Sequence, residues 1–191
     1  MSLKITFELS ESDLKHFRKM MQEAKAATSE ASDEEVIAAT KQLLDEVRNA
    51  ETKAPEFLTD RMGALDSMVG MLVDDEWKLP AQDRKRVVSA LAYFCEPEDL
   101  IPDHIPGLGF LDDAIMIELV VRELKHEIQA YDDFCRFRST EEKRRRSKGS
   151  EDFVSREEWL SSRRKALHDR MRSRRDRERG RSRSGARVRI F

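Results

Sequence analysis

Cysteine, histidine and glycine are all scarce in this chain of 191 residues, which contains two, four and seven of them. Cys95 and Cys135 lie in apolar helical patterns and not in paired spacings, so we expect both to be reduced core residues of a cytoplasmic protein. The chain contains no Cys-x-x-Cys pair, His-Glu-x-x-His helix, phosphate-binding glycine loop or Gly-x-Ser-x-Gly turn. These absences exclude the common metal, nucleotide and hydrolase motifs, and we predict no cofactor.

Long apolar runs are also absent. The most apolar segment, "AIMIELVV" from Ala114 to Val121, is eight residues long and contains Glu118. A membrane-spanning helix needs about 20 apolar residues, so we predict no transmembrane segment. The N-terminus lacks a basic flank followed by an apolar run, which argues against a signal peptide. Arg122 lies four residues after Glu118 on the same helix, and we expect the two to form a salt bridge.

Charged residues are abundant at 39% of the chain, and the two signs are separated along it. Residues 141–191 contain 19 lysines and arginines against 9 acids, whereas residues 1–140 contain 17 against 29. An acidic body therefore carries a basic tail. Such a tail has two classes of partner, an anionic molecule or the acidic body itself.

Apolar residues recur at spacings of three and four through most of the body, which predicts an all-α fold, a small helical bundle. Ser10 and Ser32 are expected to cap the first two helices, while Pro55 and Pro80 open the next two. One long helix is then predicted, with an apolar stripe running from Ile117 to Cys135.

We divide the chain into three parts. Residues 1–53 form an N-terminal strand and helices, residues 54–138 a helical core, and residues 139–191 a basic tail that is partly helical and then disordered. Within the tail, "EEKRRRSKGSED" is interpreted as a hinge, and the final "RRDRERGRSRSGAR" is too polar to fold alone.

The stretch "PEDLIPDHIPGLGFLDD", Pro97 to Asp113, interrupts the helical pattern. Its three prolines each remove a helical N–H group, and its two glycines permit a tight reversal. Asp112 or Asp113 is expected to cap the helix that follows. We interpret this stretch as the proline/glycine-rich loop of a helix-loop-helix hairpin.

The loop and its flanks carry a family resemblance. From Leu79 to Val121 the sequence "LPAQDRKRVVSALAYFCEPEDLIPDHIPGLGFLDDAIMIELVV", with the centre "DLIPD-x-IP-x-LG-x-LDD", resembles the YkvA-like family of bacterial proteins, domain of unknown function 1232. The resemblance implies a helical hairpin and no general activity. It covers neither the N-terminal region nor the basic tail, and this chain has charged helices where family members have a more apolar flank.

The loop carboxylates suggest an alternative function. Oxygen-rich clusters bind magnesium or calcium, and carboxylate pairs activate water, so a metal-dependent enzyme is the second hypothesis. The spacing does not follow the calcium-loop pattern, which has acids at alternate positions before its glycine. The candidate ligands are Asp99, Asp103, Asp112 and Asp113.

The basic tail gives the main functional hypothesis, a non-enzymatic helical binding or adaptor protein whose tail contacts nucleic acid or another polyanion. Arginine suits phosphate contacts, and the scarcity of aromatic residues near the tail favours backbone binding without sequence readout. A solubilising tail, a tail folded onto the body, a protein partner and a peripheral membrane association stay open. The candidate binding residues are Arg144, Arg145, Arg146, Arg163, Arg164, Arg172, Arg174 and Arg175.

Two short stretches alternate like β-strands, "KITFEL" near the start and "RVRIF" at the end. A lone strand leaves its backbone polar groups unpaired and needs a partner. We predict that the N-terminal strand pairs with its copy in a homodimer.

Overall fold

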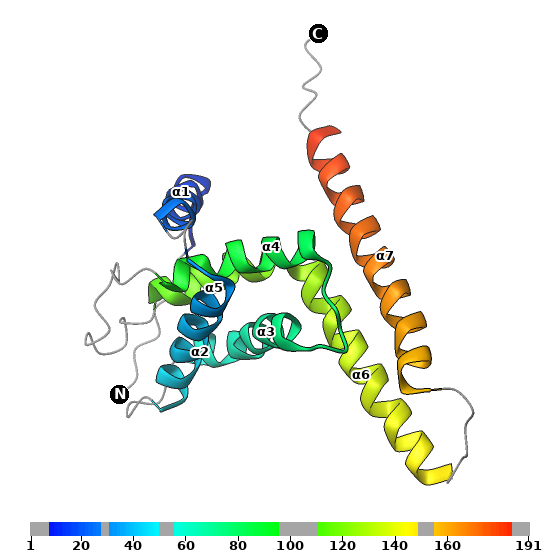
Figure 1. The fold of residues 1–191 in the computed structure, drawn as a ribbon. Helices are drawn as coiled ribbons and strands as arrows, with labels where there is room; N and C mark the ends of the chain where they lie inside the picture. The colour runs from blue at the N-terminus through cyan, green and yellow to red at the C-terminus, as the bar shows by residue number, and fades with distance from the viewer. Residues whose placement is uncertain (1–7, 28–30, 50–55, 96–110, 149–154, 185–191) are drawn as a thin grey trace. The chain divides into compact units, whose positions relative to one another are not determined.

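The structure is a computed structural model that describes residues 8–27, 31–49, 56–95, 111–148 and 155–184. Within these ranges every regular element is a helix, which confirms the all-α prediction (Figure 1). The elements are α1 (Glu11–Ala27), α2 (Asp33–Asn49), α3 (Glu56–Val73), α4 (Ala81–Leu91), the 3₁₀ turn η1 (Ala92–Cys95), α5 (Leu111–Glu123), α6 (Lys125–Lys148) and α7 (Arg156–Ser184).

Serine begins three of these helices through the same reciprocal contact. At α2, the Glu35 N–H donates to Ser32 Oγ at 3.2 Å, and the Ser32 N–H donates to Glu35 Oε2 at 2.7 Å. Ser10 makes the equivalent pair of bonds with Asp13, and Ser155 makes it with Glu158. Each pair satisfies two N–H groups that a helix start leaves without partners. The capping roles predicted for Ser10 and Ser32 are confirmed.

The contacts divide the chain into two compact units. Unit 1 comprises residues 1–66 and 84–123. In it, η1 packs against α1 and α2, and α1 packs against α5. Its buried apolar side chains come from every helix of the unit and include Met21, Val36, Leu44, Leu65, Val87, Leu91 and Ile117.

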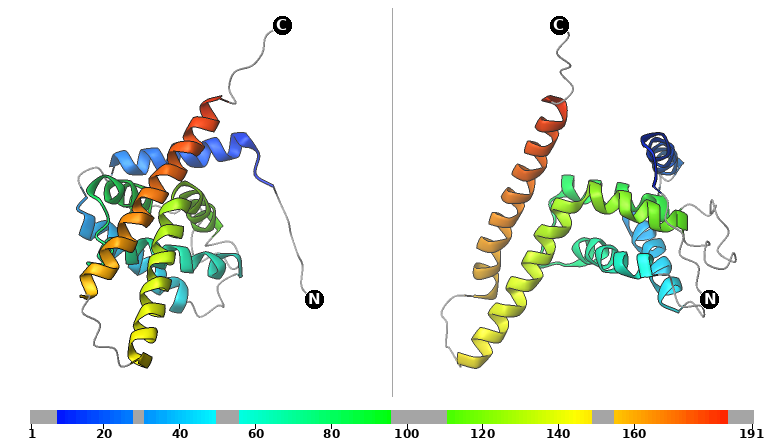
Figure 2. Two further views of the ribbon diagram at one scale, coloured as in Figure 1. Left: turned by 90° about the vertical axis from the view of Figure 1, so that its right-hand side faces the viewer. Right: turned by 180° about the vertical axis from the view of Figure 1, so that it is seen from behind.

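Unit 2 comprises residues 67–83 and 124–191. Helices α6 and α7 lie side by side along much of their length, as all three views show (Figures 1 and 2). The end of α3, the turn after it and the first residues of α4 complete the unit. Its fully buried apolar side chains include Met68, Met71, Trp77, Leu124, Phe134, Leu160, Leu167 and Met171.

The helix boundaries correct three predictions. The predicted single long helix is two helices, because α5 ends at Glu123 and α6 begins at Lys125. No proline or glycine marks this break. The predicted hinge is helical as far as Lys148, where Glu141 accepts hydrogen bonds from Arg144 and Arg145 one turn away.

The tail is also more regular than its composition suggested. The predicted disordered segment is helical as far as Ser184, the end of α7. Arginine is a good helix former, and carboxylates elsewhere in unit 2 bind the arginines of the distal turns. A polar segment that lacks apolar residues is therefore held by ion pairs.

Some predictions fall on residues outside the described ranges. The expected strands at the two chain ends lie there, except for residues 8 and 9, which precede α1 without forming a strand. The loop residues 97–110 also lie outside. The division at residues 53 and 138 stays a prediction.

Candidate functional site

A tight turn after α3 positions the polar groups of unit 2. Asp74 follows the last residue of α3, and its Oδ1 accepts hydrogen bonds from the N–H groups of Glu76 at 2.9 Å and Trp77 at 3.2 Å. Lys78 then adopts a left-handed conformation with φ of 49°, which turns the chain toward α4. This local bonding points the Glu76 carboxylate and the Trp77 ring in fixed directions.

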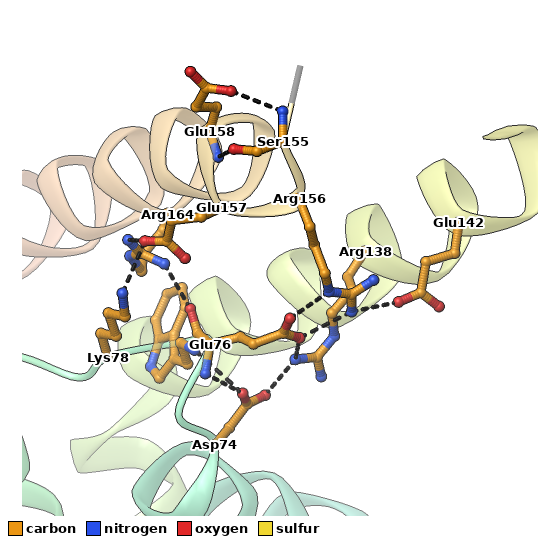
Figure 3. A network of polar contacts seen from close by, with 11 residues as sticks. Asp74, Glu76, Lys78, Arg138, Glu142, Ser155, Arg156, Glu157, Glu158 and Arg164 are labelled. Atoms are coloured by element: carbon orange, nitrogen blue, oxygen red, sulfur yellow. Dashed lines mark hydrogen bonds and ion pairs between the residues drawn. The ribbon is translucent and has the colours of Figure 1, made fainter. Parts of the chain in front are cut away.

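Glu76 is the centre of an ion-pair network drawn from three segments (Figure 3). Arg156 from the start of α7 donates to both carboxylate oxygens, and Arg138 from α6 donates to Oε2 at 3.0 Å. Arg138 also contacts Asp74 at 2.8 Å, and Arg156 donates to Glu142 at 2.6 Å. The hydrogen bond from Arg156, helped by Arg138, lowers the pKa of Glu76 despite partial burial. The network therefore ties the start of α7 to α6 and to the turn.

A second pair strengthens the same attachment. Arg164 donates to the Glu76 carbonyl oxygen at 2.8 Å and to the Glu157 carboxylate at 2.8 Å, and Lys78 donates to that carboxylate at 2.8 Å (Figure 3). Arg164 and Lys78 lower the pKa of Glu157 to about 2. Glu157 is exposed, so solvent screens this pair more than the contacts of Glu76.

Two carboxylates are fully buried beside the distal half of α7. Asp83 is 1% exposed and Glu127 is 0% exposed. Arg175 donates to both of them at 2.7 Å, and Arg172 donates to Asp83 at 3.2 Å. Burial alone would lower the pKa of Arg175, but the two carboxylates raise it above its usual value. A buried carboxylate requires a charged partner, so these arginines are structural.

A buried aromatic cluster lies between these two polar groups. Trp77 is 0% exposed, and its ring centre lies 4.3 Å from that of His168 on α7 and 5.0 Å from that of Phe134 on α6. Burial, with a smaller effect from Arg172, lowers the pKa of His168 to about 4. The sequence around His168 is polar, and nothing local to it indicates a partner 91 positions away.

Most of the eight arginines predicted to bind an anion already have partners within unit 2. Arg164, Arg172 and Arg175 bind the carboxylates described above. Arg144 and Arg145 contact Glu141. The Arg163 guanidinium lies 5.3 Å from the centre of the Phe137 ring.

The remaining cations face outward. Arg174 reaches only Gln129, at 3.5 Å. Besides Lys143, four exposed cationic side chains of unit 2 make no hydrogen bond or ion pair within the described ranges, namely Arg146, Lys165, Arg177 and Arg179. Of these four, Arg146 lies on α6, and the other three lie on α7.

The loop carboxylates are not brought together in the described part of the chain. Asp99 and Asp103 lie outside it. Asp112 and Asp113 follow Leu111, the first residue of α5, so their backbone lies in the first helical turn and not at the cap position predicted for them. Among the described residues no group of three or more acids, cysteines and histidines is arranged to hold a metal ion.

In unit 1, the predicted pairing of Glu118 with Arg122 is confirmed. Arg122 donates to Glu118 Oε1 at 2.7 Å, and Arg61 from α3 donates to Oε2 at 2.6 Å. Burial opposes ionisation of Glu118, but the two arginines lower its pKa. The three side chains border a groove of about 480 Å³ whose apolar lining comes from α1 and α5. Glu118 is thus paired with both arginines, and Glu8 is a further carboxylate that lines the groove.

The described surface has few features that would insert into a lipid bilayer. None of the described helices is both long and apolar enough to cross a membrane. Among the described residues the single large apolar side chain that is exposed is Val73, at 51%. Cys95 and Cys135 are free thiols that are half-buried, so they lie at the edge of the core and not within it.

Comparison with known proteins finds a family match in a segment of unit 1. Residues 84–119 match the family "Protein of unknown function (DUF1232)". A stretch of 46 residues is 41% identical to "Uncharacterized membrane protein YkvA" of Bacillus subtilis (strain 168). That stretch is 24% of this chain and 43% of the relative, so the chain spans less than half the length of this curated relative. No solved structure shows significant similarity to the chain.

The match includes most of α4, all of η1 and most of α5, and it ends before unit 2 resumes at Leu124. The resemblance read from the loop motif is therefore confirmed, while the basic helix α7 lies outside it. Residues 84–119 are thus similar to the YkvA-like DUF1232 family, within a longer helical chain.

Proposed function

We propose that this chain is a non-enzymatic helical binding protein that contacts nucleic acid through the basic helices of unit 2. The observation that carries the proposal is the outward set of cations, Arg146, Lys165, Arg177 and Arg179, which are exposed and have no partner within the described ranges. Unpaired guanidinium and ammonium groups on one unit are the groups that phosphate backbones recognise. The free thiols agree with a cytoplasmic location, which we propose with it.

The paired arginines have a different role in this proposal. Arg164, Arg172 and Arg175 hold α7 against acids of its own unit. Withdrawing Arg172 and Arg175 would remove the counter-charges of the buried Asp83. We therefore assign phosphate binding to the outward cations and structural support to the inward ones. In this proposal α7 has both roles open to the tail. Its inward face packs against unit 2, and its outward face binds the partner.

Binding of this kind has a measurable signature. Each phosphate neutralised by a cation releases condensed counterions, so the affinity falls steeply as salt rises. Because backbone contacts carry no sequence information, affinity should depend little on base sequence. We expect the logarithm of the binding constant to decrease linearly with the logarithm of salt concentration, for random DNA and RNA alike.

A charge-reversal experiment tests the assignment. The triple variant Lys165→Glu, Arg177→Glu and Arg179→Glu removes outward cations without touching a described ion pair. We expect its affinity for nucleic acid at low salt to fall at least tenfold, as predicted for several lost phosphate contacts (about one decade or more). The matched control, Lys15→Glu, Lys41→Glu and Lys85→Glu, makes the same change in net charge at exposed positions of unit 1. Equal losses of affinity in the two variants would show that net charge alone causes the effect, and they would overturn the assignment.

An acidic membrane surface is the second candidate partner, because the similar Bacillus subtilis protein is named a membrane protein. Val73 is the one large apolar side chain that is exposed in the described ranges. Contact with lipid would therefore be electrostatic, without insertion of apolar side chains into the bilayer. Co-sedimentation with acidic and neutral vesicles tests it. Retention by acidic vesicles that persists in excess nucleic acid would favour this second function over the first.

A further inference from the structure

Two shallow grooves follow the line along which α6 and α7 pack. The first, of about 270 Å³, is lined by Glu142, Arg145, Arg146, Arg156 and Trp159. The second, of about 240 Å³, is lined by Gln129, Asp132, Asp133, Arg136, Arg170 and Arg174. Together they hold six arginines against three carboxylates. Arg136 and Arg170 bind Asp133, Arg156 binds Glu142 and Arg145 binds Glu141, so the cationic character of the line comes mainly from Arg146 and Arg174. We call these two grooves and the residues between them the α6–α7 seam.

The α7 side of the seam is continuous. Trp159, Arg163, Arg170, Arg174 and Arg177 are separated by four, seven, four and three residues, spacings that place all five on one face of a helix. The buried residues Leu160, Leu167 and Met171 lie on a neighbouring face. From Trp159 to Arg177 the helix rises about 27 Å. An extended chain of several nucleotides can follow this distance.

Trp159 is half-buried, and it lines the first of the two grooves. One edge packs on Phe137, with ring centres 5.7 Å apart. The guanidinium carbons of Arg145 and Arg156 lie over its ring, 5.2 and 5.7 Å from the ring centre, so a base that stacks here shares the ring with these two cations. The exposed Arg146 borders the same groove and makes no ion pair within the described ranges.

We infer that the groove at Trp159 is a stacking site for one base of a single-stranded nucleic acid whose backbone runs along the α6–α7 seam. The inference rests on the proposed function and adds the form of nucleic acid that is preferred. An aromatic face accepts any base, and the exposed Arg146 beside it meets a flanking phosphate. A base inside a duplex is already stacked on its neighbours and is not available to Trp159. The seam therefore favours single strands, whereas the outward cations alone would not distinguish them from duplexes.

Tryptophan fluorescence of the full chain reports this stacking directly. The chain has two tryptophans, and Trp77 is 0% exposed, so quenching by an added oligonucleotide reports Trp159. We expect oligothymidine and oligouridine to quench the emission, and a duplex of the same length to leave it nearly unchanged. Trp159→Leu should weaken single-strand binding about tenfold, the usual effect of losing one stacked base, with duplex affinity unchanged. Trp159→Phe, which keeps an aromatic face, should restore most of the single-strand affinity.

A second variant guards against a folding effect. Arg146→Gln removes an exposed side chain with no described ion pair, and it should weaken single-strand binding while leaving the melting temperature unchanged. If Trp159→Leu lowers single-strand and duplex affinity equally, or leaves both unchanged, the stacking site is overturned while the proposed function stands. If the unmodified chain binds neither form, the proposed function and the inference both fail.

Discussion

At the scale of single residues, His168 makes the clearest pH-dependent contribution. Its pKa is about 4 in the folded chain and 6.5 in the unfolded chain, mainly because burial beside Trp77 disfavours the charged imidazole. Below pH 6.5 the unfolded chain therefore binds a proton that the folded chain does not. Stability contributed by the neutral ring is fully present above pH 6.5 and is lost as the pH falls toward 4, by as much as about 3 kcal/mol.

Chemical denaturation at a series of pH values measures this loss. Carboxylates also titrate in this range, so the informative quantity is the difference between the unmodified chain and His168→Phe. We expect the free energy of unfolding of the variant to fall less between pH 7 and pH 5. His16→Gln, at an exposed position of α1, is the control and should leave the pH dependence as it was. Parallel pH curves for the unmodified chain and His168→Phe would contradict the prediction.

Asp83 and Glu157 make a matched comparison between a buried and an exposed carboxylate. Both accept hydrogen bonds from arginines of α7, but Asp83 is 1% exposed and Glu157 is exposed. Asp83→Asn leaves Arg172 and Arg175 with less counter-charge in a buried setting, and we expect it to destabilise the chain by about 3 kcal/mol. Glu157→Gln should leave the free energy of unfolding nearly unchanged. Similar losses for the two variants, measured by urea denaturation, would show that burial does not set the strength of these pairs.

The contacts that sequence reasoning predicted at this scale are local ones. Glu118 and Arg122 are four residues apart on one helix, and Ser32 and Glu35 are three apart, so helix geometry alone brings them together. Trp77 and His168 are 91 positions apart. Their contact depends on how α7 packs, and the spacing of residues along the sequence does not indicate that packing. The same holds for Asp83 with Arg175, where two charged residues gave no sign that they are buried.

At the scale of helices, α3 offers two glycines that should respond oppositely to the same substitution. A Cβ added at Gly63 meets no atom within 4 Å, whereas one at Gly70 lies 3.0 Å from the Tyr131 hydroxyl oxygen and 3.1 Å from its ring. Alanine is the better helix former by about 0.5–1 kcal/mol. Gly63→Ala should therefore raise the melting temperature.

At Gly70 the gain in helix propensity is opposed by the contact with Tyr131. That hydroxyl donates to Asp74 at 3.1 Å, so displacing the ring disturbs the turn that positions Glu76. We expect Gly70→Ala to be neutral or destabilising in thermal melting. A rise equal to that of Gly63→Ala would mean that Tyr131 moves aside without loss.

Helices were easier to predict than their ends. Periodicity identified α1 to α4, with serine caps at the first two and prolines at the next two, because those signals are local. The break at Leu124 carries no proline or glycine, so the apolar stripe from Ile117 to Tyr131 continued through it. The tail posed the opposite problem. Composition indicated disorder beyond Arg174, but α7 continues because Asp83 and Glu127 on other segments hold it.

At the scale of the whole molecule, association through the N-terminal strand is a separate prediction. Residues 4–7, which carry most of the alternating pattern, lie outside the described ranges. If the strand pairs with its copy, light scattering should give a dimer for the full chain and a monomer for a variant lacking residues 1–9. A monomer in both cases would contradict the homodimer.

Removal of α7 tests how much the basic helix belongs to the fold. The helix supplies the buried side chains Leu160 and Leu167, and its His168 covers Trp77. A chain ending at Val154 should therefore melt at a lower temperature. Trp77 is its one remaining tryptophan, so its emission should shift to longer wavelengths as water reaches the ring.

Unchanged emission and melting in that shortened chain would mean that α7 contributes nothing to the core. If the expected change is seen, deletion of the tail cannot serve as the test of nucleic-acid binding, because it also uncovers Asp83 and Glu127. The paired and the outward arginines lie on the same helix. Truncation therefore removes both, and it cannot distinguish a loss of stability from a loss of binding. They are separable by substitution, since Arg177 and Arg179 make no ion pair within the described ranges whereas Arg172 and Arg175 do. Charge reversal at the first two should change affinity alone, and at the second two should change stability first.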